Sequence, residues 1–307
     1  MIWDPADIPD QSGRTALVTG PTLGGLGYHT ALELARRGAR VVLAGRDLTK
    51  VRAAAAAIEE GVPEASTEIL HLDLSRMESV RRAAADATAF GPVDLLVNNA
   101  GVMGTERTRT LDGLELQMQT NHFAPFLFTG LLLPQLVESG DARVVTVSSQ
   151  FHRYAGSQPT RDPREALGRY HRWQVYGQSK LANLLFTGEL DRRLAAAELP
   201  VKALAAHPGF AGTHLAANGR YGGTQGDKAS KLDRHIRWVS QSPASGARAT
   251  LMAATADLPG DTYVGPTNFF QLYGPPKVVK RSAMARDKKA AARLWAISQQ
   301  TVGLAYP

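Results

Sequence analysis

The chain of 307 residues is 44% hydrophobic and 21% charged, a balance that is typical of a globular protein and excludes a disordered or fibrous one. It has no cysteine, so disulfides, thiolate metal sites and a cysteine nucleophile are excluded as well. The formal net charge of +7 suggests an anionic partner such as nucleic acid or a membrane. Whether it indicates one depends on where the basic residues lie.

Most of the excess charge lies between Lys277 and Arg293. Seven basic residues stand there against one acid, Asp287, so this stretch carries +6. The stretch either faces an anionic partner or forms the solvated side of a basic C-terminal helix near residues 283–302. Residues at helical spacing favour the helix, namely Met284, Ala291, Trp295, Ser298 and Val302. We therefore expect no nucleic-acid partner.

No part of the sequence predicts a membrane segment. The first ten residues lack a basic start and an apolar core, and no stretch has ~20 uninterrupted apolar residues. We expect no transmembrane segment and a cytoplasmic location.

From Arg14 onward, short β-branched apolar runs alternate with longer helical stretches. The predicted strands are Thr15–Thr19, Arg40–Ala44, Thr67–Leu72, Asp94–Val97, Arg143–Ser148 and Val201–Ala206. The predicted helices are Gly27–Arg37, Leu48–Glu60, Met77–Phe90, Leu114–Glu138 and Val175–Glu198. This alternation is typical of a parallel sheet covered on both faces. No linker or repeat interrupts it, so we expect an α/β, doubly wound Rossmann fold with a single domain over residues 1–307.

Two variable segments, 151–174 and 210–240, break the alternation just after predicted strands. Loops at the carboxyl ends of strands line the ligand crevice of an open α/β sheet, so both segments are candidate substrate walls, or ordinary surface loops. Aromatic residues in and near them favour an apolar or aromatic substrate: Phe151, Tyr154, Trp173, Phe210, Tyr221 and Trp238. We assign His152 and His171 no role there beyond substrate contact.

A glycine-rich turn follows the first strand and leads directly into a helix. It contains Gly20, Gly24, Gly25, Leu26 and Gly27. Glycines allow backbone N–H groups to approach a pyrophosphate, whose charge the helix N-terminus also stabilises. The turn therefore favours a nucleotide site over a simple flexible turn.

The residue after the second strand favours a particular cofactor. Enzymes that use NAD place an acid there for the ribose 2′-hydroxyl, whereas this chain has Gly45 followed by Arg46. A guanidinium binds a 2′-phosphate in a bidentate manner, so we expect NADP(H), with NAD(H) left open. Asp47 weakens the local positive field, and a solvated Arg46 is the alternative.

Further polar and small residues follow the other strands or lie on the helices that lead away from them. They are Asp73, Leu74, Asn98, Ala100, Gly101, Asn121, Ser149, Tyr176 and Lys180. Tyr176 and Lys180 are four residues apart and share one helix face, a spacing that many ordinary helices also show. The ordered set is the stronger signal, because the fold brings each member to the same crevice.

This set resembles the short-chain dehydrogenase/reductase family from about Gly13 to Gly212. The motifs that carry the resemblance are Asn98-Asn99-Ala100-Gly101, Asn121, Ser149 and Tyr176-x-x-x-Lys180. The Arg46-Asp47 pair and the long gap from Ser149 to Tyr176 resemble the retinol dehydrogenase-like and protochlorophyllide reductase-like branch. The glycine turn departs from the family by one extra residue. Either Gly25 and Gly27 take the last two glycine positions after a bulge, or the loop is remodelled.

The resemblance implies hydride transfer between a nicotinamide and a carbonyl or alcohol carbon of a small molecule. Tyr176 would be the acid or base, with Lys180 supporting its anion and holding the nicotinamide ribose. Ser149 would bind the substrate oxygen, and Asn121 would anchor a water chain for the proton.

The resemblance also implies the remaining cofactor contacts. Asn98 would hold the central strands, Asp73 would contact the adenine, and the segment His207-Pro208-Gly209 with Thr213 would cap the carboxamide. The alternatives are a helix cap at Asp73 and a simple turn at Pro208-Gly209.

Two other functions stay open on the same fold. One is a nucleotide-binding sensor or scaffold without turnover, and the other is an epimerase or dehydratase that keeps its cofactor bound. The complete set of Asn121, Ser149, Tyr176 and Lys180 disfavours the sensor. The substrate and the direction of reaction are not specified by the sequence, and a homodimer stays open.

Overall fold

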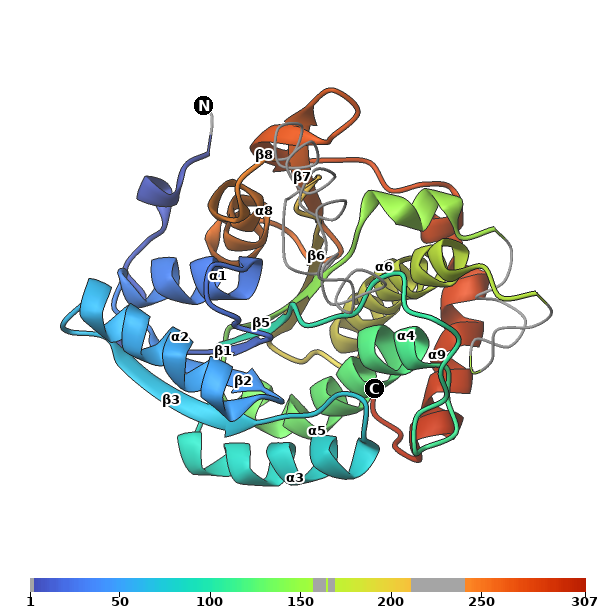
Figure 1. Ribbon diagram of the computed structural model, residues 1–307, viewed down its shortest axis with the longest axis horizontal. Coiled ribbons are helices and arrows are strands. Elements are labelled where there is room, and N and C mark those ends of the chain that lie inside the picture. Colours follow the sequence, from blue (N-terminus) through green and yellow to red (C-terminus); the bar gives the residue numbers. More distant parts are fainter. Residues whose placement is uncertain (1–2, 157–163, 165–168, 211–240) are drawn as a thin grey trace, which may run out of the picture.

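Eight strands form one sheet in the computed structural model, which describes residues 3–156, 164, 169–210 and 241–307 (Figure 1). The strand order is β3-β2-β1-β4-β5-β6-β7-β8, in which all neighbours are parallel except β7 and β8. The strands are β1 (Thr15–Thr19), β2 (Arg40–Gly45), β3 (Ser66–His71), β4 (Leu95–Asn98), β5 (Ala142–Val147), β6 (Val201–Ala206), β7 (Tyr263–Asn268) and β8 (Tyr273–Val278). The order reverses between β1 and β4, where such sheets bind their ligands.

Helices cover both faces of the sheet (Figure 1). One layer consists of α1 (Leu26–Ala35), α2 (Leu48–Gly61) and α8 (Pro243–Thr255). The other consists of α3 (Met77–Ala87), α5 (Ala124–Glu138), α6 (Arg172–Ala196) and α9 (Lys288–Val302). Within β1, Leu17 packs into the second layer and Ala16 and Val18 into the first. Successive strand residues point to opposite faces, so two buried cores give the continuous apolar strands seen in the sequence.

The predicted α/β, doubly wound fold is confirmed. All six predicted strands are present with ends within one residue, and all five predicted helices are present with ends within three residues. The structure adds α8 and the β7–β8 hairpin, which the sequence analysis did not predict. Edge strand β8 contains Gly274, Pro275 and Pro276.

The predicted helix Leu114–Glu138 is interrupted near its start. It consists of α4 (Leu116–Met118), a π-helical turn (Gln119–Phe123) and α5. Asn121 lies in the π turn, where its Oδ1 accepts from Val102 N at 2.8 Å and its Nδ2 donates to Val102 O at 2.9 Å. Single π turns are frequent at functional sites. This one aims Asn121 at the segment that leaves β4.

The basic C-terminal stretch ends in α9, whose buried side faces the core. Ala291, Trp295, Ser298 and Val302 are buried, as predicted from their spacing, and Lys288, Lys289 and Arg293 are exposed. The helix begins at Lys288, later than the predicted residue 283, because Asp287 caps it by accepting from Lys289 N and Ala290 N. The predicted packing of this helix on the core is confirmed, and its basic residues lie on the exposed side. No helix among the described residues is long and apolar enough to span a membrane.

We predict that His122 makes the protein sensitive to acid. Its ring is buried beside Phe126 and Phe186, its Nε2 lies 2.8 Å from Ser298 Oγ, and burial lowers its pKa to about 3. The unfolded chain takes up a proton near the ordinary pKa of 6.5, so stability falls as the pH drops from 6.5 towards 3. His122→Phe removes this contribution, which amounts to about 2 kcal/mol at pH 5.

Urea unfolding of wild type and His122→Phe at pH 7.5 and pH 5 measures the effect. Wild type should lose about 2 kcal/mol more than the variant between the two pH values. Buried His152 and His207 are present in both proteins and cancel in the comparison. Equal losses would show that His122 is protonated in the folded state.

Candidate active site

The residues predicted to form a site lie along one edge of the sheet, where the parallel strands end. Gly20 follows β1, Asn99 follows β4, Ser148 follows β5 and His207 follows β6. Because parallel strands share their carboxyl ends, residues far apart in the sequence meet there.

The glycines after β1 allow close backbone packing. Gly20 has φ +69°, and a Cβ on it would lie 3.0 Å from Ala100 Cα. A Cβ on Gly27 would lie 2.7 Å from Gly20 O and 2.6 Å from Asn99 Nδ2. Any side chain at these two positions would push the turn away from the β4 exit.

The additional residue of this turn is absorbed before the helix. Gly25 N donates to Thr22 O at 2.8 Å, and Gly24 adopts φ +71°, which closes a tight turn. Gly25 is then the N-cap of α1 without a side-chain hydrogen bond, and Leu26 begins the helix. This geometry fits the alternative in which Gly25 and Gly27 take the last two glycine positions after a bulge. The uncapped N–H groups at the start of α1 and the open space at Gly24 fit a pyrophosphate.

Arg46 stands exposed just after β2, and no group among the described residues pairs with it. Its neighbour Asp47 is used elsewhere, because its Oδ1 accepts from Thr49 N at 3.1 Å and Lys50 N at 3.2 Å as the N-cap of α2. The guanidinium of Arg46 is therefore available to an anionic ligand.

Asp73 does not cap the following helix. Its Oδ1 accepts from Ser75 N at 2.9 Å and from Ser75 Oγ at 2.6 Å, whereas the N-cap of α3 is Arg76. Asp73 is half-buried at the end of β3, and Leu74 is buried in the core. The helix-cap alternative is thus wrong, and the carboxylate lies at the same edge as Arg46.

The β4 exit differs in one detail from the expectation. Asn98 donates to Thr129 Oγ1 at 3.0 Å and so joins β4 to α5. The link between the central strands comes from Asn99, whose Nδ2 donates to Thr19 O at 2.8 Å. Thr19 Oγ1 in turn accepts from Asn99 N and Ala100 N, both at 3.0 Å. The motif therefore fixes the backbone of residues 99–101 beside the glycine turn.

The four predicted catalytic residues meet between the β4 and β5 exits. Tyr176 and Lys180 lie on α6, and Lys180 Nζ is 5.8 Å from the centre of the Tyr176 ring. Asn121 Nδ2 donates to Ser179 Oγ at 2.9 Å, between Tyr176 and Lys180 on the helix. A Cβ on Gly101 would lie 2.9 Å from Asn121 Oδ1 and 3.5 Å from Lys180 Nζ, so the glycine lets both approach the strand.

Burial decides the protonation of Tyr176 and Lys180. Burial raises the pKa of Tyr176 to about 12, while a hydrogen bond with the Ser149 side chain opposes the shift. Burial lowers the pKa of Lys180 to about 8, and its Nζ donates to Val147 O at 3.0 Å. Without a ligand the phenol is therefore a proton donor at neutral pH. Lys180 would therefore act on the Tyr176 phenol through its charge, and its Nζ hydrogen-bonds the backbone of β5.

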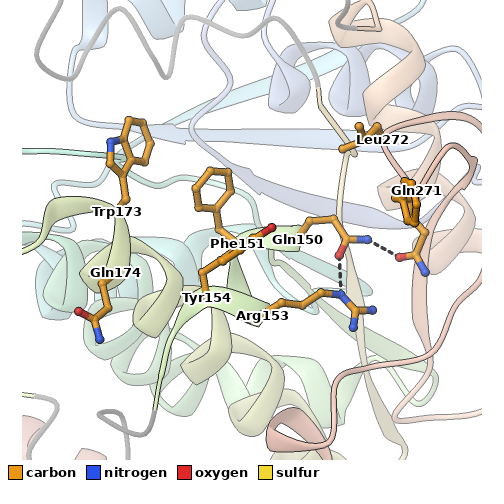
Figure 2. Close-up of a pocket in the computed structure, with 9 residues that line it drawn as sticks. Gln150, Phe151, Arg153, Tyr154, Trp173, Gln174, Gln271 and Leu272 are labelled. Carbon is orange, nitrogen blue, oxygen red and sulfur yellow. Dashed lines mark hydrogen bonds between the residues drawn. The ribbon is translucent and has the colours of Figure 1, made fainter.

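A cleft of about 1110 Å³ opens next to these residues (Figure 2). Its lining is mainly aromatic and amide side chains: Gln150, Phe151, Arg153, Tyr154, Trp173, Gln174, Phe270, Gln271 and Leu272. The centre of the Phe151 ring lies 5.7 Å from that of Tyr176 and 5.6 Å from that of Trp173, so this cleft residue packs directly against the phenol. The predicted substrate wall 151–174 is thereby placed beside the phenol by its described residues.

Other predicted residues have different positions. His152 is buried and its Nδ1 lies 2.7 Å from Ser149 O, so it supports the serine turn instead of contacting substrate. His171 is the N-cap of α6. Gly209, after Pro208, has φ +66° and packs against Leu272 O. Thr213, Tyr221 and Trp238 lie outside the described residues, as does most of the variable segment 210–240.

The sequence analysis missed several residues of the site. Thr19 and Asn183 bind backbone groups of β4 and β5, and Gly177 lets α6 approach Phe151 O. Phe270, Gln271 and Leu272 come from the β7–β8 hairpin, and the three residues before Leu272 have positive φ. Thr19 and Asn99 could have been recognised because they stand beside glycine and asparagine at the ends of predicted strands. The three hairpin residues could not, because the sequence analysis predicted no strands there.

A glycine cradle at the reversal of strand order and a buried phenol beside a lysine define a nicotinamide-dependent oxidoreductase with a Rossmann fold. The family model described as short chain dehydrogenase matches residues 14–221. The chain therefore belongs to the short-chain dehydrogenase family, whose members act on alcohol and carbonyl groups.

Similar proteins agree with this assignment. Human retinol dehydrogenase 13 is 39% identical over 305 residues, covering 98% of this chain and 87% of the relative. The crystal structure of an uncharacterised protein from Mycobacterium paratuberculosis is 42% identical, covers 100% of both chains and has a TM-score of 0.80. A short chain dehydrogenase from Shigella flexneri, solved with NADP, is 25% identical, covers 83% of this chain and 97% of that chain, and has a TM-score of 0.63. The expected retinol dehydrogenase-like branch is confirmed.

Proposed function

We propose that the protein is an NADP(H)-dependent oxidoreductase in which Tyr176 exchanges the proton of a carbonyl or alcohol substrate. The observation that carries this proposal is the position of Tyr176, which is buried, paired with Ser149 and joined through Phe151 to the aromatic cleft. A phenol in this place can reach a substrate oxygen that enters from the cleft.

Each of the four candidate catalytic residues has its own role in proton transfer. Tyr176 carries its proton at neutral pH and would donate it to the oxygen of a carbonyl. Ser149 would donate a hydrogen bond to the same oxygen as negative charge develops. The Lys180 ammonium would stabilise the phenolate left behind, and Asn121 would hold the segment from which a proton is returned. When bound, NADP(H) supplies or accepts the hydride.

The residues proposed to hold the cofactor lie, where the structure describes them, at or near the carboxyl edge of the sheet, and Thr213 lies outside the described residues. They are Gly20, Gly24, Gly25, Leu26, Gly27, Arg46, Asp73, Leu74, Asn98, Ala100, Gly101, Tyr176, Lys180, Pro208, Gly209 and Thr213. The open space at Gly24, and Arg46, which has no partner among the described residues, support NADP(H). The relative that was solved with NADP supports the same choice.

The cleft lining supports an apolar or aromatic substrate. Phe151, Tyr154, Trp173 and Phe270 contribute rings, and among the described lining residues only Arg153 is charged. Retinol, on which a relative acts according to its name, is itself apolar. A cytoplasmic location stays a prediction of the sequence.

Turnover of a carbonyl panel tests the proposed function. Aromatic and long aliphatic aldehydes and ketones, with their alcohols, are assayed with NADPH and NADP⁺, and short polar carbonyls provide the comparison. We expect turnover of apolar members. Inactivity against the whole panel would favour a nucleotide-binding sensor, and stoichiometric nicotinamide that survives dialysis would favour an epimerase or dehydratase.

We predict that Arg46→Ala weakens NADPH binding and leaves NADH binding nearly unchanged. A charged hydrogen bond contributes roughly 1.5–3 kcal/mol, which corresponds to about a 10- to 150-fold loss for NADPH alone. Calorimetric titration of both cofactors measures it. Arg52→Ala is the matched control, because Arg52 is an exposed arginine on α2.

Equal affinity of wild type for NADH and NADPH would show that Arg46 is merely solvated. An acid at Gly45 is a poorer test of the same contact. A Cβ there would lie 2.8 Å from Val51 Cγ2, so the substitution would also move α2.

A further inference from the structure

The tip of the β7–β8 hairpin has an unusual backbone. Phe269, Phe270 and Gln271 have φ of 37°, 55° and 65°, so three successive residues other than glycine adopt left-handed conformations. Such conformations cost free energy for residues with a Cβ, and they persist where surrounding contacts hold them. The contacts of this turn therefore indicate what it is built to hold.

The backbone of the turn is attached to the segment that leaves β6. Leu272 N donates to Asn268 O and Phe269 O, both at 3.1 Å, and Leu272 O accepts from Phe210 N at 2.7 Å. A Cβ on Gly209 would lie 2.3 Å from Leu272 O, so only glycine permits this approach. The hairpin tip and residues 207–210 thus form one packed unit at the carboxyl edge of the sheet.

The Gln271 side chain connects this unit to the turn that begins at Ser149. Its Oε1 lies 3.1 Å from His207 Nε2 and accepts a hydrogen bond from Gln150 Nε2. Gln150 is oriented from its other end, because its Oε1 accepts from Arg153 Nε at 2.9 Å (Figure 2). The Gln150 amide therefore presents its N–H to Gln271.

His207 also donates to Gln271. Gly209 N donates to His207 Nδ1 at 3.2 Å, so Nδ1 is the acceptor nitrogen of the ring. The buried ring is neutral, since burial lowers its pKa to about 3, and its proton lies on Nε2. The Gln271 oxygen thus accepts from the end of β6 and from the residue that follows Ser149.

We propose that Gln271 is a positioning residue, whose amide oxygen fixes the Ser149 turn relative to residues 207–209. This inference rests on the proposed function, in which Ser149 and Tyr176 share the substrate oxygen. Residues 207–209 belong to the segment proposed to face the cofactor. A misplacement of about 1 Å of a reacting group costs on the order of 10²-fold in rate. Gln271 would act on turnover through this geometry without touching substrate oxygen or cofactor.

Gln271→Met and Gln271→Glu separate hydrogen bonding from packing. Methionine keeps the length and removes the acceptor, whereas glutamate keeps an acceptor for both donors. Thr267→Ala is the control on the same hairpin, since Thr267 is exposed and its Oγ1 donates only to Asn268 Oδ1.

Steady-state kinetics on an accepted carbonyl and calorimetry with NADP⁺ are measured for each variant. We expect kcat to fall about 10- to 100-fold in Gln271→Met, with KM and the NADP⁺ Kd within about threefold of wild type. Gln271→Glu should recover most of kcat, and Thr267→Ala should match wild type. Gln150→Met removes one of the two donors to Gln271, so the double variant should be no slower than Gln271→Met alone.

Several outcomes would overturn the inference alone. They are wild-type kcat in Gln271→Met, a Gln271→Glu variant as slow as the methionine variant, and additive losses in the double variant. If wild type turns over no carbonyl, the proposed function is wrong and the kinetic comparison of the Gln271 variants cannot be made. In that case ¹⁵N resonances of His207 still test the contact, because loss of the Gln271 acceptor must shift the Nε2–H signal.

Discussion

Tyr176→Phe should lower hydride transfer by roughly 10²–10⁴-fold while cofactor binding stays nearly unchanged. Phenylalanine keeps the ring that packs 5.7 Å from Phe151 and removes only the hydroxyl paired with Ser149. The loss should therefore appear in kcat, measured by NADPH oxidation with a carbonyl that wild type accepts. Calorimetry with NADP⁺ should give the same Kd for both proteins.

Tyr306→Phe is the matched control for deletion of a buried tyrosine hydroxyl. That hydroxyl donates to Phe126 O at 2.9 Å in the helical layer, away from the cleft, so turnover should be retained. A Tyr176→Phe variant with near-normal turnover would refute proton transfer by Tyr176.

Lys180→Met should lower kcat/KM by about 10²-fold or more and leave the fold as stable as wild type or more stable. The ammonium is buried, and no carboxylate pairs with it among the described residues, so burial costs free energy in the folded state. Methionine keeps the apolar stem and removes that cost. In Lys180→Met, activity should therefore fall while the unfolding temperature stays the same or rises. Steady-state kinetics and thermal unfolding measure the two changes.

The pH dependence gives a second measurement on Lys180. Its folded pKa of about 8 lies below its ordinary 10.5, so the unfolded chain binds more protons between these values. Wild type should therefore gain stability as the pH rises from 8 to 10.5, and Lys180→Met should lack that gain. Lys202→Met, on β6, should keep it. Parallel losses of activity and stability in Lys180→Met would indicate a structural role.

Strands β1 to β6, the helices between them and the C-terminal helix followed from local sequence, and the segment from α8 to β8 did not. Strands β1, β2, β4, β5 and β6 are almost entirely buried and show as apolar runs between helices, whereas the edge strand β3 is mostly exposed. Strands β7 and β8 contain Pro266, Pro275 and Pro276, which remove ladder donors and made both segments resemble loops. For α8, the signal was present as Ser242 before Pro243, because Ser242 caps the helix by accepting from Ser245 N.

The candidate site was predicted where single residues carry the chemistry. Tyr176 and Lys180 needed only helical spacing, and Ser149 needed only its place after a strand. The π turn at Asn121 could not be predicted, since it depends on two hydrogen bonds to Val102 across 19 positions. The contact between Gln271 and His207 depends on the three-dimensional arrangement of two strands. Sequence patterns do not specify such long-range contacts.

The prolines of β8 also affect how copies of this protein can associate. β8 ends the described sheet, and a free edge offers unpaired N–H groups to another chain. Adjacent residues of a strand point their N–H positions to opposite sides, so one of Pro275 and Pro276 leaves a missing donor on the free side. The missing donor interrupts a continuous ladder along this edge, which disfavours edge-to-edge pairing of β8 with another copy.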